Sequence, residues 1–543
     1  MNLMRPLRVP SITTALLALG MIFGCVHTSF SATAAPSEAQ PSNPKLRIVI
    51  NPERTIGVVN RNIFGGFIEN LAHCIYGGVY DPKSPAADAE GFRKDVIAGA
   101  RAMGISIVRF PGGCFAPHYH WIDGIGPKKD RPKTKYGFWP AANDFGTDEF
   151  IAWCRKVGCE PQICVNMGSG TPEEARNWVE YCNGPLGTRW ADLRAKNGHP
   201  EPYNVKVWDI GNEVSGEWEY GYAEKEDDYI RQAREFAREM KLTDPSIKLV
   251  FCGNLFPTYH ARKNWNRAVL ETLYPYIDYI SMHYYVGQIG KSAISGEMEK
   301  AGPEAIHRRL TEGMMEVEDG FKVLREDIRL INYHVDQVRP IGIAMTEYNP
   351  NYHVLYKGPG NTNGWFDLSD ALAVGAFFNI FIRNADVATL CNMAQLVDVL
   401  PAMEVKQGGA GFLRQGISYV QQMFLANREN TAVDVWVNSP PFKGTFQPAV
   451  ALVDASASMD AAHKRLVLNL INRSTDQPFT CELQVPGRRI KAIRGETLGG
   501  GDLKTMNTFE APQKLIPHEA GPFTSGTIQI APKTVGVYQL ALE

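Results

Sequence analysis

Short apolar segments alternate with helix-like stretches along most of this chain, and that alternation constrains its fold more than any other feature. Continuous apolar runs bounded by turns are typical of strands buried on both faces of a parallel sheet. Eight strand–helix repeats predict an α/β fold of the (β/α)8 or TIM-barrel kind, and a doubly wound open sheet is the alternative. The eight runs are Ile63–Ile68, Ile105–Phe110, Glu160–Val165, Val205–Ile210, Lys248–Cys252, Tyr279–His283, Gly342–Met345 and Val387–Met393.

The stretches between these runs carry helix signals. Thr171 is a candidate N-cap, and Pro172–Tyr181 follows it with proline at the first helical position and two acidic residues next. Between Met314 and Val335 the apolar residues recur every three or four positions, which places them on one face of a helix. Such helices supply the crossovers that parallel strands require.

After about residue 400 the pattern changes to short β-rich segments separated by Gly, Pro, Asn and Ser. This pattern predicts an all-β sandwich, jelly-roll-like, over residues 401–543. The barrel is then expected over residues 61–400, and residues 45–60 are expected to add an N-terminal strand to the sandwich. The β-rich segments are Val433–Val437, Arg465–Ile471, Thr480–Val485, Thr527–Ile530 and Gly536–Leu542.

The N-terminus has the pattern of an export signal. A positive start is followed by the apolar stretch Ile12–Val26 and by Ala32-Thr33-Ala34, a small-residue cleavage site. The apolar stretch is short for a membrane span. We therefore predict a signal peptide over residues 1–34, a flexible leader over residues 35–44, and a periplasmic or extracellular location.

A second interpretation of the same segment remains open. Ile22-Phe23-Gly24-Cys25 is similar to a bacterial lipoprotein signal, although Phe23 fits that pattern poorly. In that interpretation Cys25 carries a lipid anchor. The rest of the chain has no second apolar run of membrane-spanning length, so no membrane span is expected.

Charge and cysteine content narrow the classes of partner. The net charge of −2 at pH 7 gives no basis for binding nucleic acid or an anionic membrane. The cysteines after Cys25 are spread singly, which does not fit a disulfide scaffold, although a pair involving Cys154 or Cys159 stays open. His118-Tyr119-His120 is a weak metal signal, and we predict no metal or organic cofactor. A homo-oligomer is left open.

Polar residues stand at the ends of the eight apolar runs. A barrel places all strand C-termini on one face, where active sites lie, so these residues are expected to meet in one site. Glu213 and Glu347 each end a short apolar run, and paired carboxylates are the working groups of glycoside hydrolysis. The run ends offer Glu69-Asn70, Arg109, Asn166, Asn212-Glu213, Asn254, His283-Tyr284-Tyr285, Glu347-Tyr348-Asn349 and Gln395.

The residues at these positions resemble a known family, the α-L-arabinofuranosidases of glycoside hydrolase family 51. The resemblance runs from about residue 45 to the C-terminus, with the motifs in the family's order. It implies a retaining glycosidase with a barrel and a C-terminal β-sandwich. The motifs are Gly65-Gly66-Phe67-Ile68-Glu69, Arg109-Phe110-Pro111-Gly112-Gly113, Trp121-Ile122-Asp123-Gly124-Ile125-Gly126-Pro127, Gly211-Asn212-Glu213, Ser281-Met282-His283-Tyr284-Tyr285 and Ala394-Gln395-Leu396-Val397.

The resemblance also implies residue roles. Glu213 would be the acid/base and Glu347 the nucleophile. Cys114 stands where many members have asparagine, and Tyr348 stands where they often have tryptophan, which puts the preferred furanoside and aglycone in doubt. The sugar subsite would be lined by Glu69, Arg109, Cys114, Asn212, His283, Tyr285 and Gln395, with Trp139 as a wall.

The chemistry is consistent with these roles. A retaining glycosidase needs one ionised carboxylate and one protonated carboxyl, about 5–5.5 Å apart, in different surroundings. Arg109 and Tyr285 are candidate donors that keep Glu347 charged, and Asn212 is a candidate ligand of a sugar hydroxyl.

Three functions follow. The first is an exo-acting enzyme that releases terminal non-reducing α-L-arabinofuranosyl residues from arabinan, arabinoxylan or derived oligosaccharides. The second is another retaining barrel glycosidase, such as a galactofuranosidase, an endo-glucanase or a xylanase. The third is a non-catalytic carbohydrate-binding protein, which the presence of both glutamates argues against.

Overall fold

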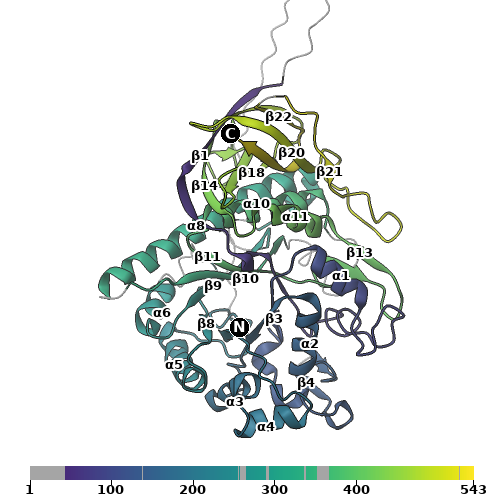
Figure 1. The fold of residues 1–543 in the computed structure, drawn as a ribbon, viewed down its shortest axis with the longest axis vertical. Helices are drawn as coiled ribbons and strands as arrows, with labels where there is room; N and C mark the ends of the chain where they lie inside the picture. Colours follow the sequence, from purple (N-terminus) through teal and green to yellow (C-terminus); the bar gives the residue numbers. More distant parts are fainter. Residues whose placement is uncertain are drawn as a thin grey trace, which may run out of the picture. The chain divides into compact units, whose positions relative to one another are not determined.

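The computed structural model describes residues 43–136, 139–254, 256, 264–288, 291, 293–335, 338–350, 366–524 and 526–543 (Figure 1). The predicted signal peptide, Cys25 and most of the leader lie outside these residues. Among the described residues, no helix has the length and apolar character needed to cross a membrane.

Eight strands form a closed barrel in which every neighbouring pair is parallel. The predicted TIM barrel is therefore confirmed, and the open doubly wound sheet is excluded. Around the barrel the order is β10-β11-β2-β3-β6-β7-β8-β9. The strands are β2 (Gly65–Phe67), β3 (Ile107–Phe110), β6 (Glu160–Cys164), β7 (Val207–Ile210), β8 (Lys248–Phe251), β9 (Tyr279–Val286), β10 (Gly342–Pro350) and β11 (Ala388–Met393).

Two strands are longer than the apolar runs indicate. β9 and β10 pair with each other as far as Val286 and Pro350, with a register shift between Met345 and Glu347. Backbone pairing extends both strands through polar residues. Because these residues are polar, the apolar runs in the sequence end before them. Glu347 therefore lies within β10, beside an irregularity, and not after the strand.

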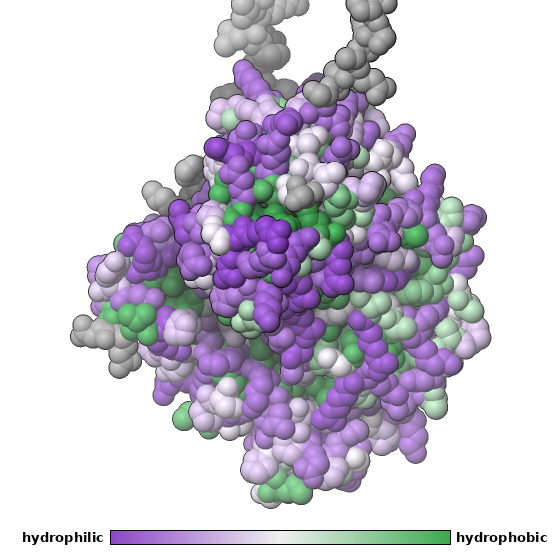
Figure 2. Space-filling model, turned by 45° about the horizontal axis from the view of Figure 1, so that its top comes forward, coloured by the Kyte–Doolittle hydropathy of each residue, from purple (hydrophilic) through white to green (hydrophobic). Residues whose placement is uncertain are grey.

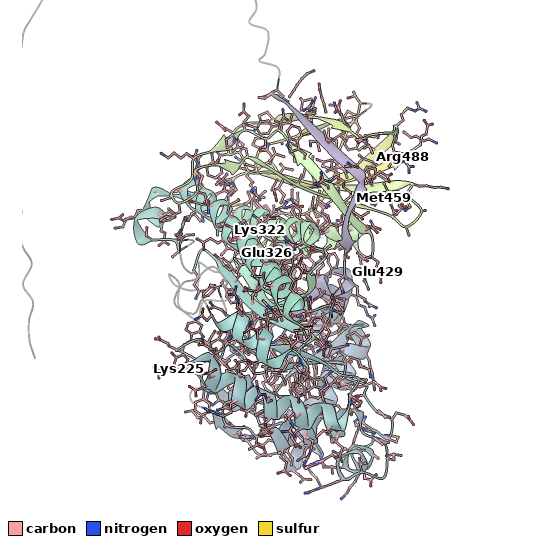
Figure 3. All side chains as sticks on the ribbon, turned by 90° about the vertical axis from the view of Figure 1, so that its left-hand side faces the viewer. Lys225, Lys322, Glu326, Glu429, Met459 and Arg488 are labelled. Atoms are coloured by element: carbon pink, nitrogen blue, oxygen red, sulfur yellow. The ribbon has the colours of Figure 1, made fainter. Side chains whose placement is uncertain are left out.

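Helices surround the barrel (Figure 1). The Thr171 hydroxyl accepts a hydrogen bond from the Glu174 amide at 3.1 Å and caps α3 as expected. In α8 the predicted apolar face is buried, and Lys322 and Glu326, labelled in Figure 3, are exposed on the other side. The helices are α1 (Lys94–Ala102), α2 (Thr147–Val157), α3 (Pro172–Asn183), α4 (Arg189–Lys196), α5 (Glu226–Thr243), α6 (Trp265–Leu273), α7 (Gly296–Ala301), α8 (Pro303–His334) and α10 (Leu368–Arg383).

The C-terminal domain is a mixed β-sheet, as its all-β pattern indicates. Its order is β21-β20-β23-β18-β17-β14-β1-β19-β22, and β1 (Lys45–Val58) pairs antiparallel with β14 and parallel with β19. Strands far apart in this order contribute to one apolar core, so the sheet curls around that core. The other strands are β14 (Thr431–Val437), β17 (Val453–Met459), β18 (Arg465–Asn472), β19 (Phe479–Gln484), β20 (Ile490–Gly499), β21 (His518–Glu519), β22 (Thr527–Ile530) and β23 (Thr534–Leu542).

The segment between barrel and sheet packs with the barrel core. It contains the hairpin of β12 (Met403–Val405) and β13 (Phe412–Arg414), followed by α11 (Gly416–Phe424). The nine-stranded sheet resumes only at Thr431, whereas the sequence places the boundary at residue 400. Helix α10 is buried on all sides because it contacts both β10 and strands of the sheet.

All nine cysteines in the described part of the chain are free, including Cys154 and Cys159. On the face drawn in Figure 2 hydrophilic residues predominate at the surface.

Candidate active site

The structure brings most of the predicted site residues together at the C-terminal ends of the barrel strands. Hydrogen bonds connect them in two groups, one around Glu347 and Glu213 and one around Glu69. The connected residues are Glu69 after β2, Arg109 in β3, Asn212 and Glu213 after β7, His283 and Tyr285 in β9, Glu347 in β10 and Gln395 after β11.

Glu347 is buried between two strong donors. Arg109 Nη1 lies 2.7 Å from its Oε1, and the Tyr285 hydroxyl lies 2.6 Å from its Oε2. Both contacts stabilise the ionised carboxylate, because each donates a proton and the guanidinium adds a full charge. This environment suits a nucleophile that must remain charged.

The Arg109 guanidinium is itself fixed on its other sides. Its Nε donates to Asp209 at 2.5 Å and its Nη2 to Asn212 Oδ1 at 2.7 Å, and the side chain is 1% exposed. Gln162 donates to the second oxygen of Asp209 at 2.8 Å. Burial raises the pKa of Asp209, although Arg109 and Gln162 oppose that shift. Asp209 is thus a site residue that sequence reasoning missed, although a lone acid inside the buried run Val205–Ile210 was an available signal.

Glu213 stands on a strained turn that aims it at the same pocket. Its φ is 42°, in the left-handed region that costs energy for a residue with a side chain, and the preceding loop also contains Gly211 at φ 85°. One carboxylate oxygen of Glu213 and one of Glu347 lie within 4.8 Å of each other. Such proximity matches the close pair of retaining glycosidases and not the wider pair of inverting ones.

Two donors hold the Glu213 carboxylate. His283 Nδ1 lies 2.8 Å from Oε1, and Trp218 Nε1 donates to Oε2 at 2.7 Å. Burial raises the pKa of Glu213, but these hydrogen bonds together with the charges of His283 and Arg109 leave that pKa below its usual value. The other His283 nitrogen lies 2.7 Å from the Thr346 hydroxyl, which fixes the orientation of the ring.

Glu69 is held by the loop after β3. Its Oε1 accepts the backbone N–H groups of Gly113 and Phe115, each at 3.0 Å, and its Oε2 accepts from Gln395 at 2.8 Å. Burial and the charge of Glu347 raise the pKa of Glu69 to about 7, against these hydrogen bonds.

The glycine pair in that loop allows its backbone to approach two carboxylates. A Cβ atom at Gly112 would lie 2.6 Å from Glu69 Cγ, and one at Gly113 would lie 2.8 Å from Glu347 Oε1. Any larger residue would therefore displace the carboxylates.

Asn212 Nδ2 and Gln395 Oε1 are buried and have no hydrogen-bond partner within the described residues. A buried amide group without a hydrogen bond is costly, so both atoms are candidate ligands of sugar hydroxyls.

Cys114 lies beside Glu213 and a further acid, Glu219, which sequence reasoning missed together with Trp218. One polar atom of each of the three residues Cys114, Glu213 and Glu219 lies within 4.8 Å of the others. Burial, with nearby carboxylates, raises the pKa of the Cys114 thiol well above its usual value, so the thiol is neutral. Trp218 and Glu219 follow Glu213 in the same loop, which was the available signal. Trp139 begins β5 (Trp139–Ala141), but its side chain lies outside the described part.

His118 and His120, the weak metal signal of the sequence, both contact protein side chains. His120 Nδ1 lies 2.9 Å from Glu174, and His118 stacks on Tyr220 with ring centroids 4.5 Å apart. Glu213, His283 and Glu347 are close enough to suit a cation. Their facing atoms already bond to each other and to Arg109 and Tyr285, so the donor set fits an ion-paired carboxylate site and we assign no metal ligand.

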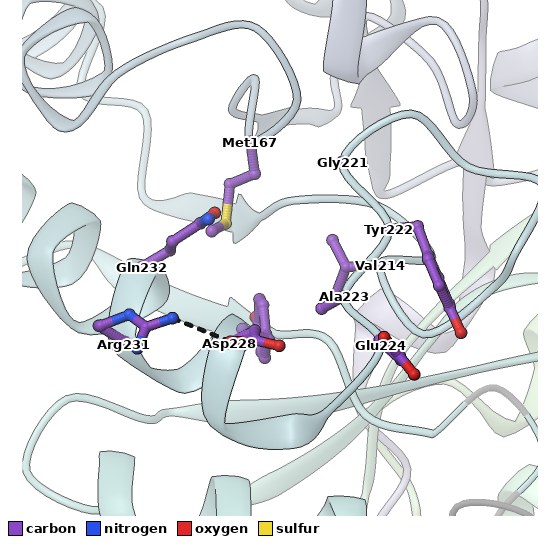
Figure 4. Close-up of a pocket in the computed structure, with 10 residues that line it drawn as sticks. Met167, Val214, Gly221, Tyr222, Ala223, Glu224, Asp228, Arg231 and Gln232 are labelled. Carbon is purple, nitrogen blue, oxygen red and sulfur yellow. Dashed lines mark hydrogen bonds and ion pairs between the residues drawn. The ribbon is translucent and has the colours of Figure 1, made fainter.

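A cavity of about 410 Å³ is lined in part by the loop that carries Glu213 (Figure 4). The loop lines it with Val214 and with residues 221–224, and Arg231 and Asp228 form an ion pair at 2.9 Å on its wall. None of the predicted site residues lines it, so we do not place the reaction there.

Comparisons with known proteins agree with this geometry. The profile of the α-L-arabinofuranosidase 1 domain matches residues 100–294, and that of the α-L-arabinofuranosidase C-terminal domain matches residues 346–531. α-L-Arabinofuranosidase C of Emericella nidulans is 40% identical over 378 residues, covering 66% of this chain and 71% of that protein.

Two further relatives cover more of the chain. The intracellular exo-α-(1→5)-L-arabinofuranosidase 1 of Bacillus subtilis is 31% identical over 490 residues, covering 88% of this chain and 94% of that protein. The structure of a family 51 α-L-arabinofuranosidase from Bifidobacterium longum superposes with a TM-score of 0.85 at 26% identity, covering 92% of this chain and all of that one. The chain therefore belongs to the α-L-arabinofuranosidases of glycoside hydrolase family 51 and is a glycoside hydrolase.

Proposed function

We propose that the protein is a retaining, exo-acting α-L-arabinofuranosidase that works by double displacement. The observation that carries the proposal is the close pair of Glu213 and Glu347, of which only Glu347 is bonded directly by Arg109 and Tyr285. Arg109 places a fixed positive charge directly against Glu347, whereas Glu213 is held by His283 and Trp218, so the two carboxyls have the different surroundings that the two roles require.

The reaction then has two steps. Glu347 attacks the anomeric carbon while Glu213 gives its proton to the leaving oxygen, which forms a glycosyl ester of Glu347 and frees the aglycone. Glu213 next removes a proton from water, and the water oxygen attacks the same carbon and releases Glu347. Two inversions give net retention.

The chain's own residues favour the transition state at several points. The unpaired Nδ2 of Asn212 supplies a donor beside the reacting centre, where a hydrogen bond strengthens as charge develops on the sugar. Glu69 and Gln395 together offer acceptor and donor groups to hydroxyls farther from the anomeric carbon. Arg109 contributes by keeping Glu347 charged.

We propose neutral arabinan and arabinoxylan fragments as substrates. The balanced net charge provides no steering toward acidic polysaccharide backbones. The name of the Bacillus subtilis relative, which specifies exo cleavage of α-(1→5) linkages, supports release of terminal residues.

A panel of nitrophenyl glycosides tests the activity, with α-L-arabinofuranoside, galactofuranoside, β-xylopyranoside and glucopyranoside compared at equal concentration. We expect the arabinofuranoside to be cleaved fastest, and NMR should detect the α-anomer of arabinose first. Faster cleavage of the xyloside or the galactofuranoside, or initial release of the β-anomer, would overturn the proposal.

We also propose that the protein acts outside the cytoplasm, on the basis of its N-terminal sequence. Fractionation of the native host followed by N-terminal sequencing should find a mature chain that starts near Ala35 or at a lipid-modified Cys25. A cytoplasmic protein that retains residues 1–34 would contradict this location while leaving the activity untouched.

A further inference from the structure

Glu219 is a buried acid of the active site that the two-step reaction does not use. It lies on the loop after β7, six positions beyond Glu213, and is 5% exposed. Neither of its carboxyl oxygens has a hydrogen-bond partner of normal geometry within the described residues, and the Cys114 thiol beside it is only a weak donor. A buried carboxyl in that condition calls for a functional explanation.

The loop brings both Trp218 and Glu219 to the Glu213 carboxylate. The Glu219 amide donates to the Gly216 carbonyl at 3.1 Å, which closes the turn. Gly216 must lack a side chain, because a Cβ atom there would lie 2.6 Å from the Trp218 ring. Trp218 Nε1 then reaches Glu213 Oε2 at 2.7 Å.

The gap between Glu213 and Glu219 suits proton transfer through one water molecule. One oxygen of each, together with the Cys114 sulfur, lies within a 4.8 Å cluster. Two hydrogen bonds of ordinary length through a single water span about this distance.

The charged surroundings favour different protonation states for the two acids. Burial and the charge of Glu213 raise the pKa of Glu219 to about 8, while His283 and Trp218 keep the pKa of Glu213 low. In the empty site at neutral pH, the proton of this pair therefore resides on Glu219. The described titratable groups that face Glu219 are Cys114 from the loop after β3, Glu213 from its own loop, and at longer range Glu69 after β2 and Glu347 in β10.

We propose that Glu219 stores the proton that Glu213 delivers to the leaving oxygen. This inference rests on the proposed function. Glu219 acts only through Glu213 and does not touch the reacting atoms. It is therefore a positioning residue, which holds the proton until Glu213 needs it. The trigger is the aglycone, which takes the place of the Trp218 N–H group at Glu213 Oε2 and removes a donor that favours the charged form.

The proton balance closes over one turnover. Protonated Glu219 passes its proton to ionised Glu213, which gives it to the glycosidic oxygen as Glu347 forms the glycosyl ester. Glu213 then accepts a proton from the attacking water, and Glu347 leaves as a carboxylate. Glu213 returns that proton to Glu219 when Trp218 bonds to it again.

This cycle keeps the charge of the site constant. The three carboxyls Glu213, Glu219 and Glu347 carry two negative charges in the empty enzyme, in the substrate complex and in the glycosyl-enzyme. A buried site facing the fixed charge of Arg109 avoids the cost of gaining or losing a net charge during the reaction.

The test compares leaving groups in Glu219→Gln. Dinitrophenyl arabinofuranoside leaves without protonation, whereas methyl arabinofuranoside or an arabino-oligosaccharide requires the acid. We expect kcat/KM to fall about tenfold or more for methyl arabinofuranoside or the oligosaccharide, and less than about twofold for the dinitrophenyl substrate. Glu217→Gln, an exposed glutamate in the same loop, is the matched control and should leave both unchanged.

Wild-type protein provides a second measurement that does not depend on folding of the variant. The kcat/KM for methyl arabinofuranoside should fall as pH rises through about 8, where the pair loses its shared proton. The kcat/KM for the dinitrophenyl substrate should not show this decline.

Equal losses for both leaving groups in Glu219→Gln would assign Glu219 to substrate binding and overturn the proposal. The proposal would also fail if kcat/KM of the wild-type enzyme for methyl arabinofuranoside declined near the ordinary pKa of a glutamate instead of near pH 8. Inactivity of the wild-type enzyme on every arabinofuranoside would instead reject the proposed function.

Discussion

Arg109 Nη1 lies 2.7 Å from Glu347 Oε1, and the rest of the guanidinium is bonded to Asp209 and Asn212. One planar group therefore links β3, β7 and β10 at the level of the chemistry. Because Asp209 and Glu347 both accept from it, removing either acid leaves part of the buried guanidinium without an acceptor, and the geometry of the pair depends on all three strands.

Arg109→Lys should lower kcat/KM by about 100-fold or more, because lysine keeps the charge but cannot donate to three partners in one plane. Steady-state kinetics with nitrophenyl arabinofuranoside measures the loss, and circular dichroism checks the fold. Arg238→Lys, at an exposed position in α5, is the control and should be silent. A loss below about fivefold would show that charge alone suffices.

Azide should distinguish the two glutamates. Glu347→Ala opens space at the nucleophile position, so azide attacks from that side and yields the inverted β-glycosyl azide. Glu213→Ala keeps the nucleophile, so azide attacks the glycosyl-enzyme and yields the retained α-product. NMR of the azide products from an activated arabinofuranoside provides the measurement, and identical stereochemistry from both variants would reject the assignment of roles.

The sequence predicted the barrel because eight buried strands each left an uninterrupted apolar run. It also placed most site residues, since a barrel collects its strand ends on one face. It could not place Asp209, Trp218 or Glu219. Asp209 lies within a strand run, and the contacts of the other two depend on the path of a loop. Neither kind of contact can be derived before the chain is folded.

The extension of β10 was missed for a related reason. Thr346, Glu347 and Asn349 are polar, yet all three are buried in the strand. Their burial depends on partners from other strands, such as the bond of Thr346 to His283, and on carbonyl groups after β11 that accept from Asn349. The hydrophobic pattern ends where such polar pairing begins. The strand expected from that pattern therefore ended at Met345, whereas β10 continues to Pro350.

Glu69 should make stability depend on pH. Its pKa is raised to about 7 in the folded protein from an ordinary value near 4.5, so the folded state binds more protons between those values. Stability from this group is present below about pH 4.5 and is lost as pH rises through about 7, by roughly 3 kcal/mol.

Thermal unfolding at pH 5 and pH 8 measures this effect in wild type and in Glu69→Gln. We expect the drop in Tm between the two pH values to be smaller in the variant, whatever constant offset the lost Gln395 hydrogen bond introduces. An unchanged difference would show that Glu69 titrates normally in the folded protein. Glu217→Gln is the control for a glutamate that is exposed.

Tyr285→Phe should separate stabilisation of the nucleophile from sugar binding. The variant removes only the hydroxyl that donates to Glu347 Oε2 at 2.6 Å, and it leaves the ion pair with Arg109 in place. A hydrogen bond to a charged group contributes about 1.5–3 kcal/mol, so kcat should fall by roughly 10- to 100-fold with a smaller change in KM. Tyr333→Phe, at an exposed site in α8, is the matched control. A rise in KM at constant kcat would mean that Tyr285 serves the sugar, and Arg109 alone would then hold the charge of Glu347.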